Sequence, residues 1–420
     1  MYLGVEILYV EMNAGANRER ASWPRRKANM SKFGKSSLLL LIAIVLVGLN
    51  LRPALASIGP LLDAIQRAIG LTDTRASLLT TIPVFLMGAC ALSAYRLRRL
   101  TGERYGILLG IAVIGLACAG RAGVSTGAGL VGTAVAAGIG IAIVQALLPA
   151  FIRRCFAERA GGVMGYYSTA IMGGAVSASV LSPRLASHFG WVAALASWCL
   201  PALLAAGAWM LATRGAGHSV VITEATRTPF SRSPRAWLLA LFFGLGTGAY
   251  TLVLAWLPPY YTGLGWTPVD AGELLGVVTL AEVVAGLAVS FWIDRLPDRR
   301  PALLSAILSL FVGLLCLLIA PLQLALPSAI LMGLGIGALF PLSLIVAMDH
   351  ASDPRQAGEL AAFVQGSGYL IAATFPFIAG VLRQHMASLG LAWVLMAGLS
   401  LVLVGIALRF SPASYARMSG

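Results

Sequence analysis

Long apolar runs, separated by short polar segments, make up most of the chain. A helix that crosses the hydrocarbon core of a bilayer needs about 20 mostly apolar residues. Twelve runs meet this requirement, so we predict an all-α integral membrane protein with twelve transmembrane helices. The predicted spans are 37–61, 76–95, 104–122, 125–152, 161–184, 190–212, 236–261, 268–293, 301–321, 325–349, 356–382 and 388–409.

The composition agrees with a membrane protein and excludes two other classes. Of the 420 residues, 59% are hydrophobic and 11% are charged, whereas a water-soluble domain carries about 25% charged residues. A chain this apolar is not intrinsically disordered either. The five cysteines lack C-x-x-C spacing and the four histidines lack metal-ligand spacing. We therefore predict no disulfide, no metal site and no cofactor.

The distribution of basic residues predicts the orientation. Because the net charge of +14 is spread over many short loops, it favours a role in membrane orientation over nucleic-acid binding. With the N-terminus inside, 24 of the 30 Lys and Arg residues fall in cytoplasmic segments and five, Arg121 among them, in outer loops. This asymmetry predicts that both termini lie in the cytoplasm.

A polar, basic segment at residues 213–235 follows the sixth span and divides the spans into two sets of six. We predict two six-helix bundles, at 37–212 and 236–410, with 213–235 as a cytoplasmic linker and 411–420 as a cytoplasmic tail. Residues 1–36 form a basic N-terminal segment, and Met30 is an alternative translation start.

Arg52 is the cation that lies deepest in a predicted span. It stands about fifteen residues into the first span, roughly 22 Å along a helix. A charge at that depth costs at least about 2.5 kcal/mol and usually has a functional role or a partner. Pro53 cannot donate a backbone hydrogen bond, which leaves the Leu49 carbonyl free. We predict that the planar guanidinium binds a small anion; a structural ion pair is the alternative.

Glu282 is the acidic residue near the middle of a span, at a depth similar to that of Arg52. A carboxyl group in an apolar environment gains and loses protons near neutral pH, which suits a proton carrier. We predict that Glu282 couples transport to protons. A neutral hydrogen-bonded carboxyl group and an ion pair with Arg52 are the alternatives.

Uncharged polar and aromatic side chains complete the predicted site. A buried amide is costly to leave without a partner, and residues four apart share one helix face. For the aromatic residues, a belt at the membrane interface is the alternative, more strongly for Trp256 than for Tyr250. The predicted substrate-binding residues besides Arg52 are Asn50, Gln145, Tyr250, Trp256, Gln365 and Tyr369.

No motif predicts an enzyme. Gly244–Ala249 matches the G-x-G-x-x-A pattern of nucleotide-binding turns, but it lies inside a span and indicates close helix packing instead. The chain has no metal-ligand set, no nucleophile–base set and no ATP-binding signature. Any transport is therefore expected to be driven by gradients.

Three motifs in corresponding spans resemble those of the cyanate and nitroimidazole transporter family. They are Asn50-Leu51-Arg52-Pro53, the segment from Tyr250 to Tyr260 that contains Trp256-Leu257-Pro258-Pro259, and Gln365-Gly366-Ser367-Gly368-Tyr369. This family belongs to the major facilitator superfamily. The resemblance implies two pseudo-symmetric six-helix bundles, a substrate site near the midplane between them, and the inner membrane of a bacterium as the location.

The resemblance also implies gating loops. In the superfamily, the loop between spans two and three carries a G-x-x-x-D-R-x-G-R-R pattern. Here Tyr95 stands at the Asp position, while Arg96 and Arg99 keep basic positions. The equivalent loop after span eight keeps Asp294, Arg295 and Arg299. We therefore expect the gate to depend more on the second loop than on the first.

These features predict a secondary transporter that moves a small anion, cyanate-like or a small carboxylate, by alternating access. An exporter of small drugs such as nitroimidazoles is one alternative, and a membrane sensor without transport activity is another. The predicted partners are a small-molecule substrate, the lipid bilayer and protons, with no nucleic acid. Because one chain encloses its own site, a monomer is expected.

Overall fold

The computed structural model describes residues 35–214, 230–351 and 353–412. Contacts between residues divide the chain into residues 1–39 and 40–420, and the second unit carries every feature considered below. The predicted start at Met30 and most of the basic N-terminal segment, linker and tail lie outside the described residues. Within the described ranges the chain forms helices and turns and no strand, so the all-α prediction is confirmed.

The helices before residue 213 are called the N-half, and those after residue 229 the C-half. The N-half contains α2 (Lys35–Leu49), α3 (Pro53–Ala56), α4 (Ile58–Ile69), α5 (Asp73–Leu92), α6 (Ala94–Thr101), α7 (Glu103–Gly120), η1 (Arg121–Gly123), α8 (Gly127–Phe156), η2 (Ala157–Arg159), α9 (Ala160–Ala196) and α10 (Cys199–Ala212). The C-half contains η3 (Phe230–Arg232), α11 (Pro234–Gly263), α12 (Pro268–Trp292), η4 (Ile293–Arg295), α13 (Arg300–Ile319), α14 (Ala325–Asp349), α15 (Pro354–Ala372), α16 (Thr374–Met386) and α17 (Gly390–Ala407).

The helices agree with the predicted spans. In the described part of the chain, ten helical stretches are long and apolar enough to cross a membrane. The pair α9 and α10, bent by 42°, provides one further span if it is counted as one. Gly190 interrupts α9 with a non-helical φ of 80°. The end of α9 and α10 therefore cover the sixth predicted span, and the helices occupy all twelve predicted positions.

The first span is broken where Pro53 interrupts its hydrogen bonding. The amides of Asn50 and Leu51 bond to carbonyl groups three residues earlier, at 3.1 Å each, which tightens the last turn of α2. The chain then resumes as α3, with Arg52 at its N-cap position. The break is enclosed by α9, where a Cβ on Gly174 would come within 2.1 Å of the Leu49 carbonyl oxygen.

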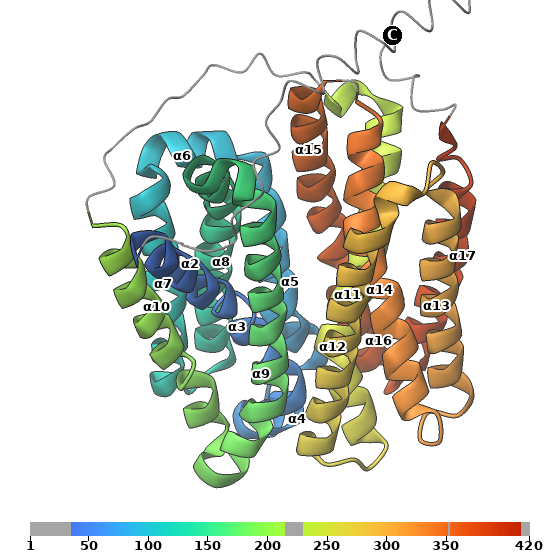
Figure 1. Ribbon diagram of the computed structural model, residues 1–420. Coiled ribbons are helices and arrows are strands. Elements are labelled where there is room, and N and C mark those ends of the chain that lie inside the picture. The colour runs from blue at the N-terminus through green and yellow to red at the C-terminus, as the bar shows by residue number, and fades with distance from the viewer. Residues whose placement is uncertain (1–34, 215–229, 352, 413–420) are drawn as a thin grey trace, which may run out of the picture. The chain divides into compact units, whose positions relative to one another are not determined.

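The two halves pack against each other through small residues. Helices α9 and α12 lie side by side (Figure 1), and a Cβ on Gly272 would come within 2.3 Å of the Ser179 carbonyl oxygen. Helices α5 and α15 also meet closely, since a Cβ on Gly88 would come within 2.7 Å of the Gly366 carbonyl oxygen. Such close backbone approach is typical of helix packing in membranes.

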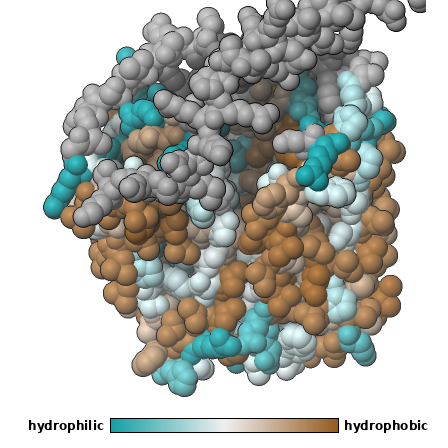
Figure 2. Space-filling model, viewed as in Figure 1, coloured by the Kyte–Doolittle hydropathy of each residue, from teal (hydrophilic) through white to brown (hydrophobic). Residues whose placement is uncertain are grey.

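The two ends of the bundle are named here by the chain. The linker end is where α10 ends and α11 begins, and the far end is where α4 leads into α5 and α11 into α12. The linker end is uppermost in Figure 1. Figure 2 shows a broad hydrophobic band across the visible face, with hydrophilic residues along its lower edge. This surface is the one expected of helices in contact with lipid.

Candidate functional site

Arg52 lies in a cluster of aromatic residues in the interior of the protein. Its side chain is 5% exposed, and its guanidinium carbon is 5.4 Å from the centre of the Tyr250 ring. Its Nη1 atom is 3.9 Å from the sulfur atom of Met87. A guanidinium over an aromatic face is attracted by the negative face of the ring, more strongly when both are removed from water. The break before Pro53 therefore places the Arg52 guanidinium against the ring of Tyr250.

Three tyrosines from both halves surround this cation. Arg52 interacts electrostatically with the hydroxyl groups of Tyr167 on α9, Tyr250 on α11 and Tyr369 on α15. The ring of Tyr369 is fixed by an edge contact with Phe243, with the ring centres 5.6 Å apart. Residues of both halves thus meet at one guanidinium, as a central binding site requires.

Two polar atoms of this cluster have no hydrogen-bond partner among the described residues. They are Nε of Arg52 and the hydroxyl group of Tyr250, and both are buried. A buried polar group without a partner costs about 1–3 kcal/mol, more when it is charged. A ligand with acceptor atoms would remove this cost. The cluster of Arg52, Tyr167, Tyr250 and Tyr369 is called the central site below.

Glu282 lies close enough to affect this site but does not form an ion pair with Arg52. Its side chain is 6% exposed, and it interacts electrostatically with Arg52 and Tyr250. The α12 backbone at Glu282 is held against α14, because a Cβ on Gly337 would come within 2.3 Å of the Glu282 carbonyl oxygen. Glu282 is therefore a buried carboxyl group in the field of Arg52, without direct contact.

The predicted amides differ in their environments. Asn50 donates to the carbonyl oxygen of Leu46 at 2.7 Å and to that of Pro201 at 3.1 Å, so its amide secures the break in the first span to α10. Gln145 on α8 and Gln365 on α15 are half-buried, and neither side chain forms a hydrogen bond in the described structure. Gln365 stands one turn before Tyr369 on the same face of α15.

Trp256 is fully buried, which contradicts the alternative of a membrane-interface belt. Its indole nitrogen donates to the carbonyl oxygen of Pro376 at 2.9 Å, and the guanidinium carbon of Arg383 lies 5.4 Å from its ring. It stands about 9 Å along α11 from Tyr250, toward the far end. Trp256 thus joins α11 to α16, on the far-end side of the central site.

Charged and polar residues join the two halves at the far end. Arg383 on α16 contacts Asp63 on α4 at 3.3 Å and Asp73 on α5 at 3.6 Å. Thr262 on α11 also donates a hydrogen bond to Asp63. These four residues, Asp63, Asp73, Thr262 and Arg383, are called the far-end cluster. Arg184 on α9 forms a further ion pair with Glu273 on α12.

Sequence analysis missed the far-end cluster. Asp63 lies beyond the predicted end of the first span, but the helix continues to Ile69. Arg383 was counted in an outer loop, and Asp73 falls between the first two predicted spans, so neither was considered as a site residue. Arg121, which was counted in an outer loop, lies in η1 between α7 and α8, but its side chain is buried: it is 1% exposed and donates to the Ala54 carbonyl oxygen at 3.0 Å. The sequence did contain a signal for these residues, because each of these charged residues lies within a few residues of an apolar run.

The predicted gating residues at the linker end differ in their contacts. The Nε atom of Arg299 is 3.0 Å from a carboxylate oxygen of Asp349, and its Nη1 atom donates to the carbonyl groups of Ile293 and Leu296. Arg99 and Arg295 are exposed. The side chains of Arg96 and Asp294 lie outside the described residues.

The N-half has ion pairs of its own at the linker end. Glu103, at the start of α7, contacts Arg98 at 3.2 Å and Arg154 at 2.9 Å. In the C-half, Arg235 donates to the Nε2 atom of His350 at 3.0 Å and to the Arg409 carbonyl oxygen at 2.9 Å. Both loops therefore carry contacts that fix helix ends within one half.

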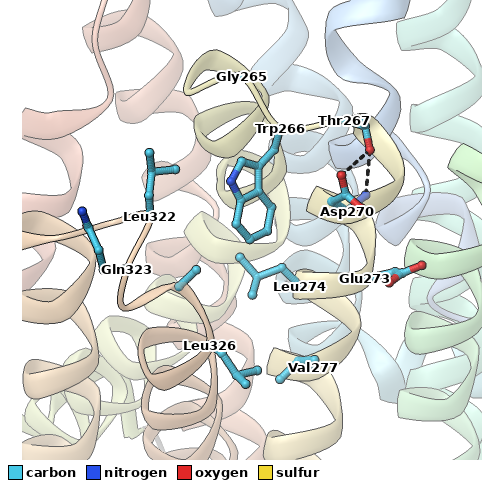
Figure 3. Close-up of a pocket in the computed structure, with 11 residues that line it drawn as sticks. Gly265, Trp266, Thr267, Asp270, Glu273, Leu274, Val277, Leu322, Gln323 and Leu326 are labelled. Atoms are coloured by element: carbon cyan, nitrogen blue, oxygen red, sulfur yellow. Dashed lines mark hydrogen bonds between the residues drawn. The ribbon is translucent and has the colours of Figure 1, made fainter.

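A cavity of about 640 Å³ opens at the far end of the C-half. Figure 3 shows Trp266, Leu274 and Leu322 around it, while Glu273 points away from it. Asp270 is engaged by Thr267, whose hydroxyl group donates to it at 2.7 Å. The cavity contains none of the predicted site residues, so it is separate from the central site.

Comparisons with known proteins identify the family. A model of the Major Facilitator Superfamily matches residues 38–376 and 263–419. The cyanate transport protein CynX of Escherichia coli (strain K12) is 37% identical over 382 residues, which cover 90% of this chain and 99% of that protein. The 2-nitroimidazole transporter of the same organism is 31% identical, over 84% of this chain and 90% of its own length. The chain belongs to the cyanate and nitroimidazole transporter family of the major facilitator superfamily.

Solved structures agree with this membership at the level of the fold. The D-xylose-proton symporter has a TM-score of 0.70 at 14% identity, covering 89% of this chain and 97% of its own. A bacterial homologue of the human lysosomal transporter Spinster also has a TM-score of 0.70, at 16% identity, covering 91% and 98%. The family membership makes the chain a multi-pass membrane transporter of this superfamily that acts on a small molecule, and it confirms the prediction of a transporter rather than an enzyme.

Proposed function

We propose that the protein carries a small anion, cyanate or a small carboxylate, across the inner membrane of a bacterium by alternating access. The halves 37–212 and 236–410 move about the central site, with the linker end in the cytoplasm. The observation that carries the proposal is the guanidinium of Arg52, which is buried between the halves and has no carboxylate in contact.

The chemistry of the central site favours an anion. A guanidinium removed from water needs a counter-charge or hydrogen-bond acceptors, and the surrounding groups are a thioether and tyrosine rings. Tyrosine hydroxyl groups can donate to an anion that the guanidinium holds. The site residues are Arg52, Tyr250 and Tyr369, with Gln145 and Gln365 as polar neighbours along the path. The side chains of Asn50 and Trp256 support this site through hydrogen bonds to backbone carbonyl groups.

Glu282 is the proposed proton carrier. A carboxyl group near Arg52 but not paired with it can hold a proton while the anion occupies the guanidinium. Binding of an anion reduces the positive field at Glu282, which favours proton uptake. Anion and proton would then move together. The transporter works as a monomer, because residues of both halves of one chain complete the site.

The identity of the substrate is tested by ligand binding to purified protein in detergent. Cyanate, acetate and 2-nitroimidazole are titrated against the wild type, Arg52→Met and Arg52→Lys, with thermal stability as the readout. Arg75→Met, a change at an exposed arginine of α5, is the matched control. Loss of charge-assisted hydrogen bonds worth about 2–3 kcal/mol should weaken cyanate binding about 30- to 150-fold in Arg52→Met.

The lysine variant adds a geometric test. Because an ammonium group lacks the planar fork of a guanidinium, Arg52→Lys should lose much of the affinity as well. Unchanged cyanate binding by a folded Arg52→Met protein would overturn the proposal. The role of Glu282 is then tested with the variant Glu282→Gln. The flux of labelled cyanate into proteoliposomes is measured for this variant and for the wild type, with and without a pH gradient.

A drug exporter is the second candidate, favoured by the 31% identity to a 2-nitroimidazole transporter. A nitroimidazole is neutral and aromatic, so it would stack on the tyrosine rings and depend less on Arg52. Stabilisation by 2-nitroimidazole that persists in Arg52→Met, with none by cyanate, would favour this candidate.

A further inference from the structure

Thr247 on α11 has an unusual hydroxyl group. Buried hydroxyl groups on helices normally bond to a carbonyl group of the preceding turn. Thr213, Thr279 and Ser343 do so here, at 2.7, 3.0 and 2.8 Å. Thr247 is 5% exposed, yet its hydroxyl oxygen has no partner among the described residues. The side chain does not use the backbone acceptor that its helix provides.

Helix geometry gives the direction in which Thr247 faces. Residues 247, 250, 254 and 258 follow the i, i+3, i+7, i+11 pattern of one helix face. On this face the Tyr250 ring lies over Arg52. Farther along, the Leu254 carbonyl oxygen and the Pro258 ring approach Gly59 of α4. The face therefore points at the N-half, and Thr247 continues it by about 4.5 Å from Tyr250 toward the linker end.

The neighbouring positions of α11 have other partners. Gly248 packs against the Phe375 ring, and Thr251 donates to the Ala372 carbonyl oxygen at 3.0 Å. Gly246 faces Leu339 of α14. Gly246 and Gly248 are therefore committed to packing within the C-half, and Thr251, one turn from Thr247 on the same side of α11, already has an acceptor for its hydroxyl group. The face of Thr247 and Tyr250 thus carries two buried hydroxyl groups without partners, one turn apart, beside a guanidinium whose Nε also lacks one.

We propose that Thr247 is a substrate-binding residue that contacts the end of the anion farthest from Arg52. Arg52 and the Tyr250 hydroxyl group then hold one end of the anion, and the Thr247 hydroxyl group holds the other. The ligand that fits is a small anion with a hydrogen-bond acceptor at each end, as in cyanate, whose nitrogen and oxygen are its terminal atoms. This inference rests on the proposed anion-binding role of Arg52 and extends it to specificity.

The substitution Thr247→Val tests this role because valine has nearly the same shape and lacks only the hydroxyl group. Cyanate is titrated against the purified full-length protein, with thermal stability as the readout. Losing one hydrogen bond to a charged ligand should weaken cyanate binding about 10-fold, and Thr247→Ser should bind like the wild type. The matched control is Thr279→Val, whose hydroxyl group bonds to the Leu275 carbonyl oxygen on α12. This control should leave cyanate affinity unchanged.

The unliganded proteins provide a second readout. Thr247→Val removes a buried hydroxyl group that has no partner, so its stability without ligand should equal or exceed that of the wild type. Thr279→Val removes a satisfied hydrogen bond and should lose stability. A ligand-binding residue is therefore distinguished from a structural one by opposite effects on affinity and on stability.

The outcomes separate this inference from the function on which it rests. If Arg52→Met loses cyanate binding while Thr247→Val binds like Thr279→Val, the role of Thr247 is overturned and that of Arg52 stands. If cyanate binds the wild type and Arg52→Met equally, or binds neither, the proposed function fails and this inference with it. A Thr247→Val protein less stable than the wild type without ligand would also contradict the inference, because the hydroxyl group would then have a structural partner.

Discussion

The two ends of the bundle use charge in different ways. At the far end, Arg383 of the C-half contacts Asp63 and Asp73 of the N-half, and Arg184 pairs with Glu273 across α9 and α12. At the linker end, the ion pairs of Glu103 and of Arg299 each join residues of one half. Glu103 binds arginines of the N-half, and Arg299 binds Asp349 of the C-half.

This difference separates two physical roles. An ion pair between two bodies contributes to the free energy of one arrangement and is lost when the bodies move apart. An ion pair inside one body persists through the motion and contributes to the stability of that body. We therefore expect the far-end cluster to contribute to the equilibrium between conformations, whereas the linker-end contacts of Glu103 and Arg299 hold helix ends in place. The predictions below test this separation.

The largest effect is expected from Arg383→Gln. Without the guanidinium, the C-half loses its ion pairs with Asp63 and Asp73 of the N-half, so the far end should open. A change of about 1.4 kcal/mol shifts the ratio of the two states tenfold, and losing two partly buried ion pairs reaches that size. Spin labels at the exposed residues Ala68 and Ser388, one in each half, report the separation. Their distance distribution should gain a longer component.

Arg75→Gln is the control for Arg383→Gln, because it removes an exposed arginine from the same end. Its distances should match those of the wild type. If Arg383→Gln also leaves the distribution unchanged, the far-end cluster does not govern the conformational equilibrium. The double variant Asp63→Asn with Asp73→Asn should open the far end as Arg383→Gln does, because Arg383 then lacks both of its partners in the N-half.

Glu103→Gln should have a smaller effect, on stability alone. The Glu103 carboxylate is buried, while the side chains of Arg98 and Arg154 are 38% and 42% exposed. Because water screens both arginines, the loss should be about 1–2 kcal/mol rather than the full cost of breaking a buried pair. Thermal unfolding in detergent measures this loss. The distance between Ala68 and Ser388 should not change, and a longer distance would contradict a role confined to the N-half.

The features that could be predicted from the sequence are those that one helix determines. Apolar runs give the spans, and Arg52 stands out because a cation inside such a run is costly. Tyr250 and Tyr369 were predicted from their places inside spans, Tyr369 also from its spacing to Gln365, and the structure brings both to Arg52. Tyr167 also reaches Arg52 but was missed, because a tyrosine in an apolar run carries no distinguishing pattern.

The far-end cluster could not be predicted because its contacts join distant parts of the chain. Asp63 and Arg383 are 320 residues apart, and each by itself resembles an ordinary charge at a helix end. Met87 has no distinguishing signal in the sequence, yet its sulfur atom contacts Arg52. Such pairings depend on how the two halves dock, which no local pattern encodes.

The smallest expected effect concerns pH at the linker end. His350 is buried, and burial, together with the Arg235 guanidinium, lowers the pKa of His350 below its ordinary value of about 6.5. The Nδ1 atom of its ring lies 2.7 Å from the Val346 carbonyl oxygen, and its Nε2 atom accepts from Arg235. The folded protein therefore keeps this ring neutral. As the pH falls through about 6.5, the unfolded chain takes up a proton that the folded protein does not, so stability falls.

The variant His350→Gln tests this linkage, because glutamine can accept from Arg235 and does not titrate. Between pH 7.5 and 5.5 the wild type should lose more thermal stability than His350→Gln, by less than about 3 °C, since about 1 kcal/mol shifts the melting temperature of a large domain by that amount. His188→Gln, at an exposed histidine, is the control and should behave like the wild type. Equal losses in wild type and His350→Gln would show that this histidine does not contribute. Because the His350 contacts lie inside the C-half, the same pH change should leave the Ala68–Ser388 distance as it is.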